Sequence, residues 1–455
     1  MRAPLRILAR LAALLAALQL AIQPAAAQSI LRDAETEQLL QDMVDPLAEA
    51  AGLGKGAVEI VLVQDNSINA FVAGGQRIYI HSGLINAADT ANEVQGVMAH
   101  ELGHITGGHI IRSSEGISQA TNITIVSLLL GVAAIAAGAG EAGMGILAAG
   151  QQAAMGKYLA FSRVQESSAD AASVDFLSKA GISGRGSIEF FKKLQNLEFR
   201  YGVSQDDEAG FSRTHPLTGD RITNLERDFQ RDPAWNKPND PKLEERFQRA
   251  KAKLYGYLAK PQDTLRAYPT TMTGIPARYA RAYAYHKDAQ VDKALTETNA
   301  LIAADPQNPY FLELEGQILL ESGRPRDALE PLREATRLTN NTPLIATTFG
   351  HALVATENQS NFEEAEQVLK AAVTKDRYNP FAWYQLGVVY AARGDMPRAR
   401  LASAEQQSMS GQMAMALTSA EAAERGLPPG SPDWLRAQDI AMAPKAELER
   451  QKKRK

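Results

Sequence analysis

Residues 99–106 read Ala-His-Glu-Leu-Gly-His-Ile-Thr, and this stretch sets the expectations for the rest of the chain. His100, Glu101 and His104 follow the spacing HExxH. Because one helical turn takes 3.6 residues, both imidazoles lie on one face and can reach a single ion. Glu101 lies about 100° further around the helix, where it can approach a water molecule without binding the ion. Two histidines, an open position and a carboxylate base form the arrangement of zinc hydrolases.

The flanking residues place this motif on a buried helix, predicted from about Asn92 to Gly107. Thr90 and Glu93 form a capping-box pair at its start. Apolar residues fill the rest of the helix, so the two histidines would be buried polar groups without partners unless they bind something. A helix with two hydrogen-bonded core histidines is the alternative. The apolar residues are Val97, Met98, Leu102 and Ile105.

A zinc site needs a third protein ligand, and the residues closest in sequence do not provide it. The extended pattern HExxHxxGxxH requires histidine at position 110, which is Ile110. His109 comes one residue early, so on a continuing helix it would point about 100° away from the ligand position. We therefore expect His109 to support the site without binding the metal.

Carboxylates are the remaining candidates for the third ligand. Glu166 and Asp170 are spaced i and i+4 on a helix predicted from Leu159 to Lys179 and closed by Gly181. Glu166 can bind the metal while Asp170 accepts the free N–H of a ligating histidine. Paired acids on helices are usually solvated, but this helix is rich in alanine and apolar residues, and unpaired buried acids are costly.

Composition narrows the chemistry. The 455 residues contain no cysteine, which excludes a catalytic thiol, a disulfide scaffold, a cysteine-based metal site and a lipid-modified N-terminal cysteine. Five of the seven histidines lie between His81 and His215, so a transition-metal site is expected there. The net charge of −4 argues against nucleic-acid binding, which needs a basic face.

The first 27 residues have the layout of a secretory signal peptide. Three arginines precede an apolar run of about 12 residues, Pro24 ends that run, and Ala25 to Ala27 provide a cleavage site. The run is short of the roughly 20 residues needed to span a bilayer, although an uncleaved anchor is the alternative. Cleavage after Ala27 would leave an acidic exported chain, which suits a bacterial periplasm.

The rest of the first half reads as α+β. An amphipathic helix is predicted from about residue 28 to 51, and short strands at Val58–Val63 and Arg77–Ile80 flank a turn-like stretch at residues 66–69. The predicted catalytic domain is 28–232, followed by a proline-marked linker at 233–244.

The second half repeats with a period near 34 residues. Prolines at 276, 309, 343 and 380 are accompanied by alanines at 294, 328, 365 and 399. This period, with small residues where two helices cross, is typical of tetratricopeptide repeats, which stack into a solenoid with a concave face. An irregular helical domain with accidental periodicity is the alternative. We predict an all-α repeat domain at 245–425 and a C-terminal tail at 426–455.

The combined motifs resemble the HtpX-type zinc metallopeptidases, metallopeptidase family 48. The resemblance rests on His100-Glu101-x-x-His104, then Glu166-x-x-x-Asp170, then Thr214-His215-Pro216 with Arg221 downstream. The stretches 69–71 and 75–84 also look like that family. The resemblance covers roughly residues 55–230. It implies an α+β zincin-like (gluzincin) metalloprotease domain, which is followed here by the tetratricopeptide-repeat solenoid.

The resemblance implies one zinc ion per chain on His100, His104 and Glu166, with Glu101 as general base. Asp170, His109 and Arg221 would contact these groups rather than the metal. The strand containing Ile78, Tyr79 and Ile80 would be an edge that pairs with an extended substrate. His215 has two alternative roles: a hydrogen-bond donor to the tetrahedral oxyanion, or an occupant of the open zinc position that holds the enzyme inactive.

A second apolar stretch, residues 123–149, joins the two helices that carry the expected ligands. Its length permits a transmembrane helix. Its glycine and alanine content favours a helical hairpin that packs over the cleft or lies on a membrane surface.

We therefore expect a periplasmic zinc metalloendopeptidase that degrades misfolded or misassembled envelope and outer-membrane proteins. Its repeats would recruit unfolded substrates or the machinery that assembles outer-membrane β-barrels, and a peripheral membrane contact is also expected. The alternatives are a chaperone-like assembly factor with latent protease activity and an integral membrane quality-control protease.

Overall fold

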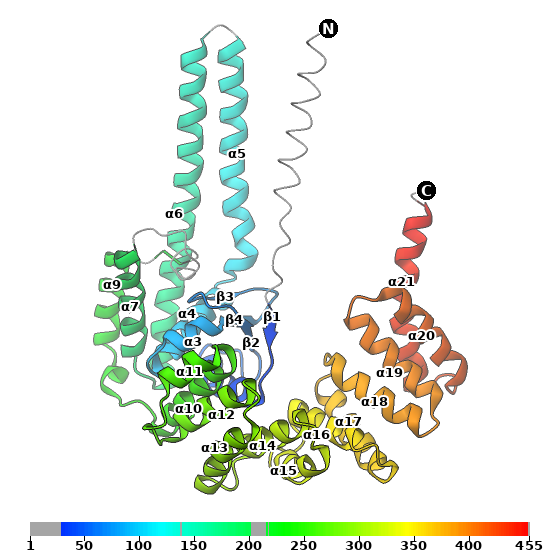
Figure 1. The fold of residues 1–455 in the computed structure, drawn as a ribbon. Helices are drawn as coiled ribbons and strands as arrows, with labels where there is room; N and C mark the ends of the chain where they lie inside the picture. The colour runs from blue at the N-terminus through cyan, green and yellow to red at the C-terminus, as the bar shows by residue number, and fades with distance from the viewer. Residues whose placement is uncertain (1–28, 137–138, 202–214, 217, 454–455) are drawn as a thin grey trace, which may run out of the picture.

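An α+β unit and a curved series of helix pairs make up the computed structural model (Figure 1). The structure describes residues 29–136, 139–201, 215–216 and 218–453. The predicted signal peptide at 1–27 lies outside the described residues. These two parts match the expected fold class, an α+β peptidase domain followed by an all-α solenoid.

A four-stranded sheet forms the base of the α+β unit, in the order β1-β2-β4-β3. The strands are β1 (Ser29–Leu31), β2 (Glu59–Gln64), β3 (Ala70–Val72) and β4 (Arg77–His81). Strands β2 and β4 are parallel, and both outer pairs are antiparallel. The sequence located β2 and β4 but missed β1 and β3, because strands of three residues are too short to show an alternating pattern.

The sheet order corrects one expectation. Ile78, Tyr79 and Ile80 lie in β4, which is paired on both sides: Ile80 lies opposite Leu62 of β2 and opposite Ala70 of β3. The prediction that this strand is an open edge is therefore wrong. Within the described residues, the edges of the sheet are β1 and β3.

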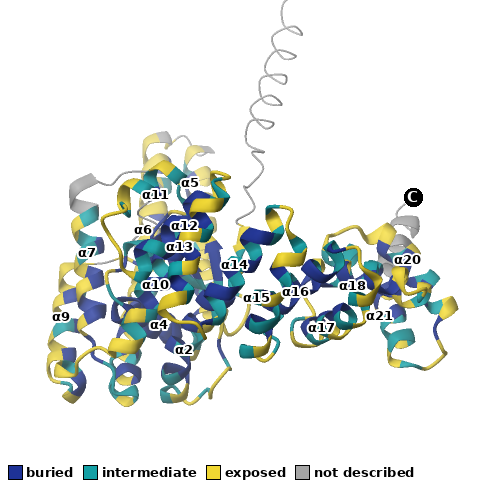
Figure 2. Cartoon of the chain, turned by 60° about the horizontal axis from the view of Figure 1, so that its bottom comes forward, coloured by how far each residue is buried: buried dark blue, intermediate teal, exposed yellow. Residues whose placement is uncertain are grey.

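Helices cover the sheet and enclose one hydrophobic core. Helix α4 (Ala91–Thr106) begins at Thr90, whose side chain accepts a hydrogen bond from the Glu93 amide, as the capping pattern predicts. Figure 2 shows buried residues concentrated in α4, α2 and the neighbouring α10. The other helices of this unit are α2 (Ala34–Ala50), α3 (Ser82–Ala87), α7 (Arg185–Tyr201) and α9 (Gly219–Gln230).

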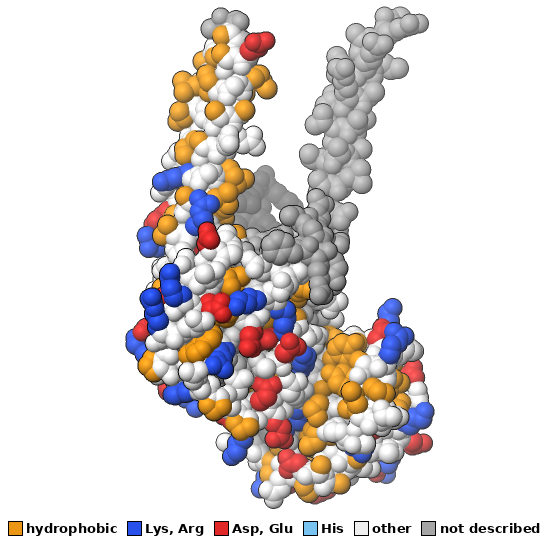
Figure 3. All heavy atoms as spheres, turned by 90° about the vertical axis from the view of Figure 1, so that its left-hand side faces the viewer, with side chains coloured by type: hydrophobic (Ala, Val, Ile, Leu, Met, Phe, Trp, Pro, Cys, Tyr) orange, Lys and Arg blue, Asp and Glu red, His pale blue; other side chains and the backbone are white. Residues whose placement is uncertain are grey.

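A long antiparallel hairpin follows the motif helix α4, and its second arm carries Glu166. Helices α5 (His109–Ala136) and α6 (Gly140–Ala180) lie side by side and extend away from the body, rather than over the cleft (Figure 1). Figure 3 shows apolar side chains along its outer part and basic ones nearer its base. Residues 109–135 have the length and apolar composition to cross a membrane, and 6% of their apolar window is buried. Exposed members include Ile125, Leu129 and Leu130.

Paired helices form the second part of the chain. The first helices of four pairs each begin with a proline in their first turn, and the four predicted alanines are buried where the second helices pack. The tetratricopeptide-like architecture is thus confirmed. The pairs are α12/α13 (Ile275–Lys287, Val291–Ala304), α14/α15 (Pro309–Glu321, Pro325–Leu338), α16/α17 (Pro343–Ala355, Phe362–Lys375) and α18/α19 (Pro380–Ala392, Met396–Met409).

The predicted boundary between linker and repeats, at 244/245, falls inside helix α10, and the one at 425/426 falls at the last residue of α20. The linker expected at 233–244 contains a short 3₁₀ helix η2 (Pro233–Asn236) and the start of α10 (Pro241–Leu258), which precedes α11 (Pro261–Ala267). Phe247 and Leu254 of α10 belong to the core of the peptidase unit. The expected tail instead contains α21 (Pro432–Lys453), which packs on α20 (Met413–Gly426) through Ala437 and Ala441. Helices α10 and α21 each have an apolar face, and the repeat pattern alone does not reveal it.

Gly103 permits the close crossing of α4 and α6. A Cβ atom at this position would lie 2.7 Å from the Ala169 carbonyl oxygen and 2.8 Å from its Cα. We expect Gly103→Ala to lower the free energy of unfolding by about 2 kcal/mol, because two helix backbones must separate. Gly145→Ala is the matched control: this α6 glycine has open space around it, so alanine should be neutral or stabilising by up to about 1 kcal/mol. Equal unfolding free energies for the two variants in denaturant titrations would contradict the packing argument.

Candidate metal centre

Four buried side chains from three segments converge below the hairpin. Helix α4 provides His100 and His104, α6 provides Glu166, and the segment before α9 provides His215. One potential ligand atom from each lies within 4.8 Å of all the others. The sequence predicted three of these as ligands, and the structure brings those three together.

The distances fit a shared cation. The Nε2 atoms of His100 and His104 are 3.2 Å apart, and each lies 3.4 Å from one carboxylate oxygen of Glu166. Two imidazole nitrogens that face each other repel unless a proton or a cation lies between them. Two nitrogens and a carboxylate oxygen are ligands that divalent zinc accepts. The residues present therefore suit a metal of this kind.

Both motif histidines have a contact on the opposite side of the ring. Asp170 Oδ1 lies 3.0 Å from Nδ1 of His100, and His109 Nδ1 lies 2.9 Å from Nδ1 of His104. These contacts leave both Nε2 atoms directed at the cluster, as a ligating histidine requires. His109 reaches this place by a route that the sequence analysis did not anticipate. Helix α4 ends at Thr106, and Gly108 adopts φ +62° before α5 begins, so the chain turns back toward His104.

Arg221 of α9 links the carboxylates of the site. Its guanidinium donates to Asp170 through two nitrogens, and its Nη1 lies 2.8 Å from Glu166 Oε2. Nη1 also donates to the carbonyl oxygen of Pro216, which follows His215. Arg221 therefore fixes the two carboxylates of α6 relative to the segment that contains His215. It also offsets part of the buried negative charge.

His215 lies inside the cluster. Its Nδ1 is 3.0 Å from Glu166 Oε1 and 3.3 Å from His100 Nε2, while its Nε2 is 3.4 Å from Glu101 Oε1. The side chain is buried. A surface position for this histidine is thus excluded; Thr214, which the family resemblance included, lies outside the described residues.

Burial and charged neighbours shift the pKa values of the groups in this cluster. Burial raises the pKa of Glu101 to about 7, close to the value that suits a general base at neutral pH. Burial opposes ionisation of Glu166 as well, but hydrogen bonds from His100, His104 and His215 outweigh it, so the pKa of Glu166 lies well below its usual range. Although burial works against it, hydrogen bonds to Asp170 and Glu166 raise the pKa of His100 to about 9. The cluster therefore favours a positive charge at its centre.

Other predicted residues lie outside the cluster. His81, at the end of β4, contacts Ser67 through a 2.8 Å hydrogen bond and takes no part among the four converging side chains. The sequence analysis missed Phe191 of α7, whose ring meets the His100 ring edge-on at 5.9 Å. The amphipathic pattern of residues 185–201 predicts a helix but not what its buried face touches. Strand β3 was also missed, and it packs beside α4.

A zincin-type α+β unit with this cluster defines a metallopeptidase. Residues 34–228 match the model described as Peptidase family M48. The chain is thus a metalloendopeptidase with tetratricopeptide-like repeats.

Two relatives align over most of the chain, and a third aligns over about a third of it. It is 25% identical to the beta-barrel assembly-enhancing protease of Yersinia pestis, over 87% of this chain and 80% of that protein. It is 24% identical to the protein of the same name from Escherichia coli (strain K12), over 86% of this chain and 79% of that protein. Metalloprotease LoiP of Escherichia coli (strain K12) is 32% identical over 35% of this chain and 57% of that protein.

The contact between Asp170 and His100 leads to a test of metal affinity. Asp170→Asn should weaken zinc binding by about 10- to 100-fold, because the amide orients the imidazole less strongly and makes it less basic. Asp175→Asn, five residues further along α6, changes an exposed carboxylate paired with Lys179 and should leave affinity unchanged. Competition with a chromogenic chelator measures both values, and equal affinities would exclude the orienting role of Asp170.

Proposed function

We propose that this chain is an exported zinc endopeptidase that degrades misfolded or misassembled outer-membrane proteins in the periplasm. The observation that carries the proposal is the convergence of His100, His104 and Glu166 with Glu101 beside them. The three would hold one zinc ion, and none of them is exposed. The proposal that the chain is exported rests on the predicted signal peptide and on the relatives, whose names refer to β-barrel assembly.

Zinc held by these residues supplies a Lewis acid that polarises a carbonyl group and acidifies water. Glu101 accepts a proton from water and returns it to the leaving amine, a role that suits its pKa of about 7. Asp170 and His109 fix the tautomers of His100 and His104 through their Nδ1 atoms. Arg221 holds Glu166 in place.

Strand β3 is the substrate edge that we propose in place of β4. It is an edge of the sheet, it packs beside the motif helix α4, and its outer backbone groups are available for an added strand. Phe71 of β3 stacks on Tyr79 of β4 at 5.0 Å, which stiffens this short edge.

His215 is proposed to act as a gate. Its Nδ1 lies among the ligand atoms of the cluster, in the position that an incoming substrate group would need. Its contact with Glu101 also restrains the proposed base. Displacement of the segment that carries His215 would open the site. A latent site of this kind favours, as a second candidate function, an assembly factor whose proteolysis is switched on only for defective substrates.

The partners follow from the two surfaces outside the site. The repeats would recruit unfolded substrates or the β-barrel assembly machinery, consistent with the names of the relatives and with the peptide-binding grooves that such solenoids form. The exposed apolar hairpin α5/α6 would make a peripheral membrane contact.

Replacement of Glu101 tests the peptidase assignment. Glu101→Gln keeps size and hydrogen bonding but cannot accept a proton, so casein hydrolysis should fall by 10²- to 10⁴-fold while zinc content stays unchanged. Zinc content by atomic absorption is the control. Undiminished hydrolysis by a zinc-loaded variant would sink the proposed mechanism.

Replacement of His215 separates its two roles. His215→Ala should raise casein hydrolysis if the side chain blocks the open position. A loss of 10²- to 10³-fold would instead support the oxyanion role. Met442→Ala, which changes an exposed residue of α21, should leave the rate unchanged.

A further inference from the structure

Buried charges join the peptidase unit to the repeats. Glu35, in the first turn of α2, accepts hydrogen bonds from Arg249 of α10 and from Tyr279 of α12. Lys253 of α10 forms an ion pair with Asp33, the residue that caps α2. Of these contacts, the one from Tyr279 crosses from the start of α2 to the first repeat pair, whereas Arg249 and Lys253 lie on α10 in the peptidase core.

Glu313 on α14 is the unbalanced member of this group. Its Oε2 atom is buried and has no hydrogen-bond partner among the described residues. Three carboxyl groups, of Asp33, Glu35 and Glu313, lie near two cations, of Arg249 and Lys253, so an ionised Glu313 leaves one negative charge in excess. Burial raises the pKa of Glu313 to about 7, although the charge of Lys253 opposes this. A buried acceptor atom such as Glu313 Oε2, which lacks a hydrogen-bond donor, can be satisfied by a cationic ligand.

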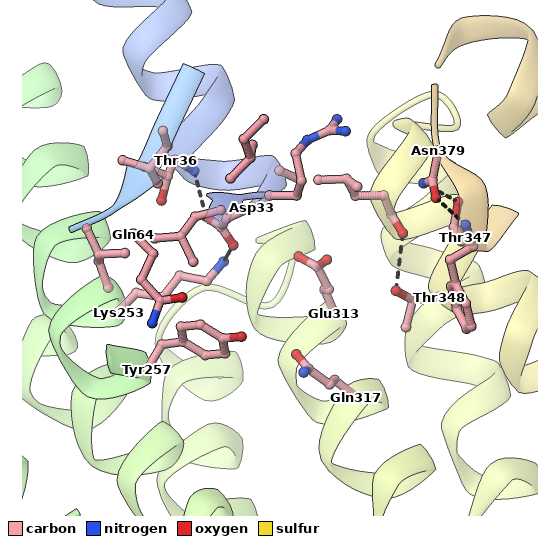
Figure 4. A pocket seen from close by; sticks show the side chains of 18 of the residues that line it. Asp33, Thr36, Gln64, Lys253, Tyr257, Glu313, Gln317, Thr347, Thr348 and Asn379 are labelled. Carbon is pink, nitrogen blue, oxygen red and sulfur yellow. Dashed lines mark hydrogen bonds and ion pairs between the residues drawn. The ribbon is translucent and has the colours of Figure 1, made fainter. Parts of the chain in front are cut away.

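The carboxylate of Glu313 faces a cavity of about 730 Å³. Strand β1 and the start of α2 line one side, and α14, α16 and α18 line the concave side of the repeats. Figure 4 shows Glu313 and Gln317 projecting from α14 between Asp33 and Thr36 on one side and Thr347 and Thr348 on the other. This volume accommodates several residues of an extended chain.

One wall of the cavity is the edge of the sheet. Among the described residues β1 pairs only with β2, and Ile30 at its centre is 59% exposed. A second cavity, of about 610 Å³, borders the same residues, Ile30, Leu31 and Arg32. The two cavities border β1 along the edge of the sheet, and such edges pair readily with extended segments.

We propose that this groove is a docking site for an extended substrate segment, which adds a strand to β1 and places a Lys or Arg side chain on Glu313. Strand addition provides affinity through main-chain hydrogen bonds, and the excess carboxylate selects a basic side chain. The occupant is a segment of protein substrate, so the inference rests on the proposed peptidase function.

The groove is separate from the catalytic edge. Strands β1 and β3 lie at opposite edges, three strand spacings or roughly 14 Å apart across the sheet. A docked segment therefore cannot be the segment that is cut. The site selects unfolded chains long enough to reach from β1 around to β3, which folded proteins do not supply.

Fluorescence anisotropy with two labelled nonapeptides tests this site. One has the sequence Ser-Val-Thr-Val-Lys-Val-Thr-Val-Ser, and the other has Gln at its centre. The full chain carries Glu101→Gln so that neither peptide is cut. The Lys peptide should bind at least 10-fold more tightly than the Gln peptide. Adding Glu313→Gln should remove that difference and leave binding of the Gln peptide unchanged.

Glu321→Gln is the matched control. Glu321 lines the same cavity but already accepts a hydrogen bond from His286 at 2.7 Å, so this change should alter affinity less than 2-fold. Equal affinity of the Glu101→Gln chain for the two peptides would overturn the proposal, as would an equal loss in Glu321→Gln. This peptide comparison decides the matter even if Glu313→Gln does not fold.

A Lys peptide with alternate N-methylated amides tests strand addition, and undiminished binding would reject it. Casein hydrolysis by the chain without substitutions is measured in parallel. Normal hydrolysis without peptide binding would reject the groove and leave the peptidase function standing, whereas absent hydrolysis with selective binding would do the reverse.

Discussion

The close crossing of helices α4 and α6 is the constraint on which the metal centre depends. Gly103 lets the two backbones approach until the Ala169 carbonyl lies where a side chain would be. That approach brings Glu166 within 3.4 Å of both motif histidines, although 62 residues separate it from His104 in the sequence. The intervening residues form a hairpin that leaves the body and returns, so its length does not disturb the crossing.

Charge balance accounts for the rest of the centre. Each buried carboxylate has a cationic or polar contact: Arg221 reaches both Asp170 and Glu166, and Asp170 reaches His100. Since buried charges are costly unless paired, these contacts fix the orientation of the groups before any metal binds. The same argument explains why His215 can enter the cluster, because the carboxylate of Glu166 offsets the cost of burying its ring.

The two edges of one small sheet give the molecule two different surfaces. Strand β3 lies beside the motif helix, while β1 faces the concave side of the repeats. The ion pair of Arg32 with Asp376 and the hydrogen bond from Tyr279 to Glu35 hold the repeats beside β1 and the start of α2, which makes the groove a product of both parts of the chain. With the proposed groove and the proposed gate at His215, recognition and cleavage would act on different segments of one unfolded substrate, and the gate would control only cleavage.

The sequence by itself determined the elements with regular periods: the motif helix, the α6 helix, two strands and the repeat pairs. The i and i+4 spacing placed His100 and His104 on one helix face and Glu166 and Asp170 on another, and the family resemblance implied that these two faces meet. Sequence could not determine β1 and β3, the open edges of the sheet, or the contact of His109, since these depend on three-residue strands and on a break at Gly108. The position of His215 and the groove at Glu313 were decided only by tertiary structure, because no local period relates residues that meet across 49 or more positions of the chain.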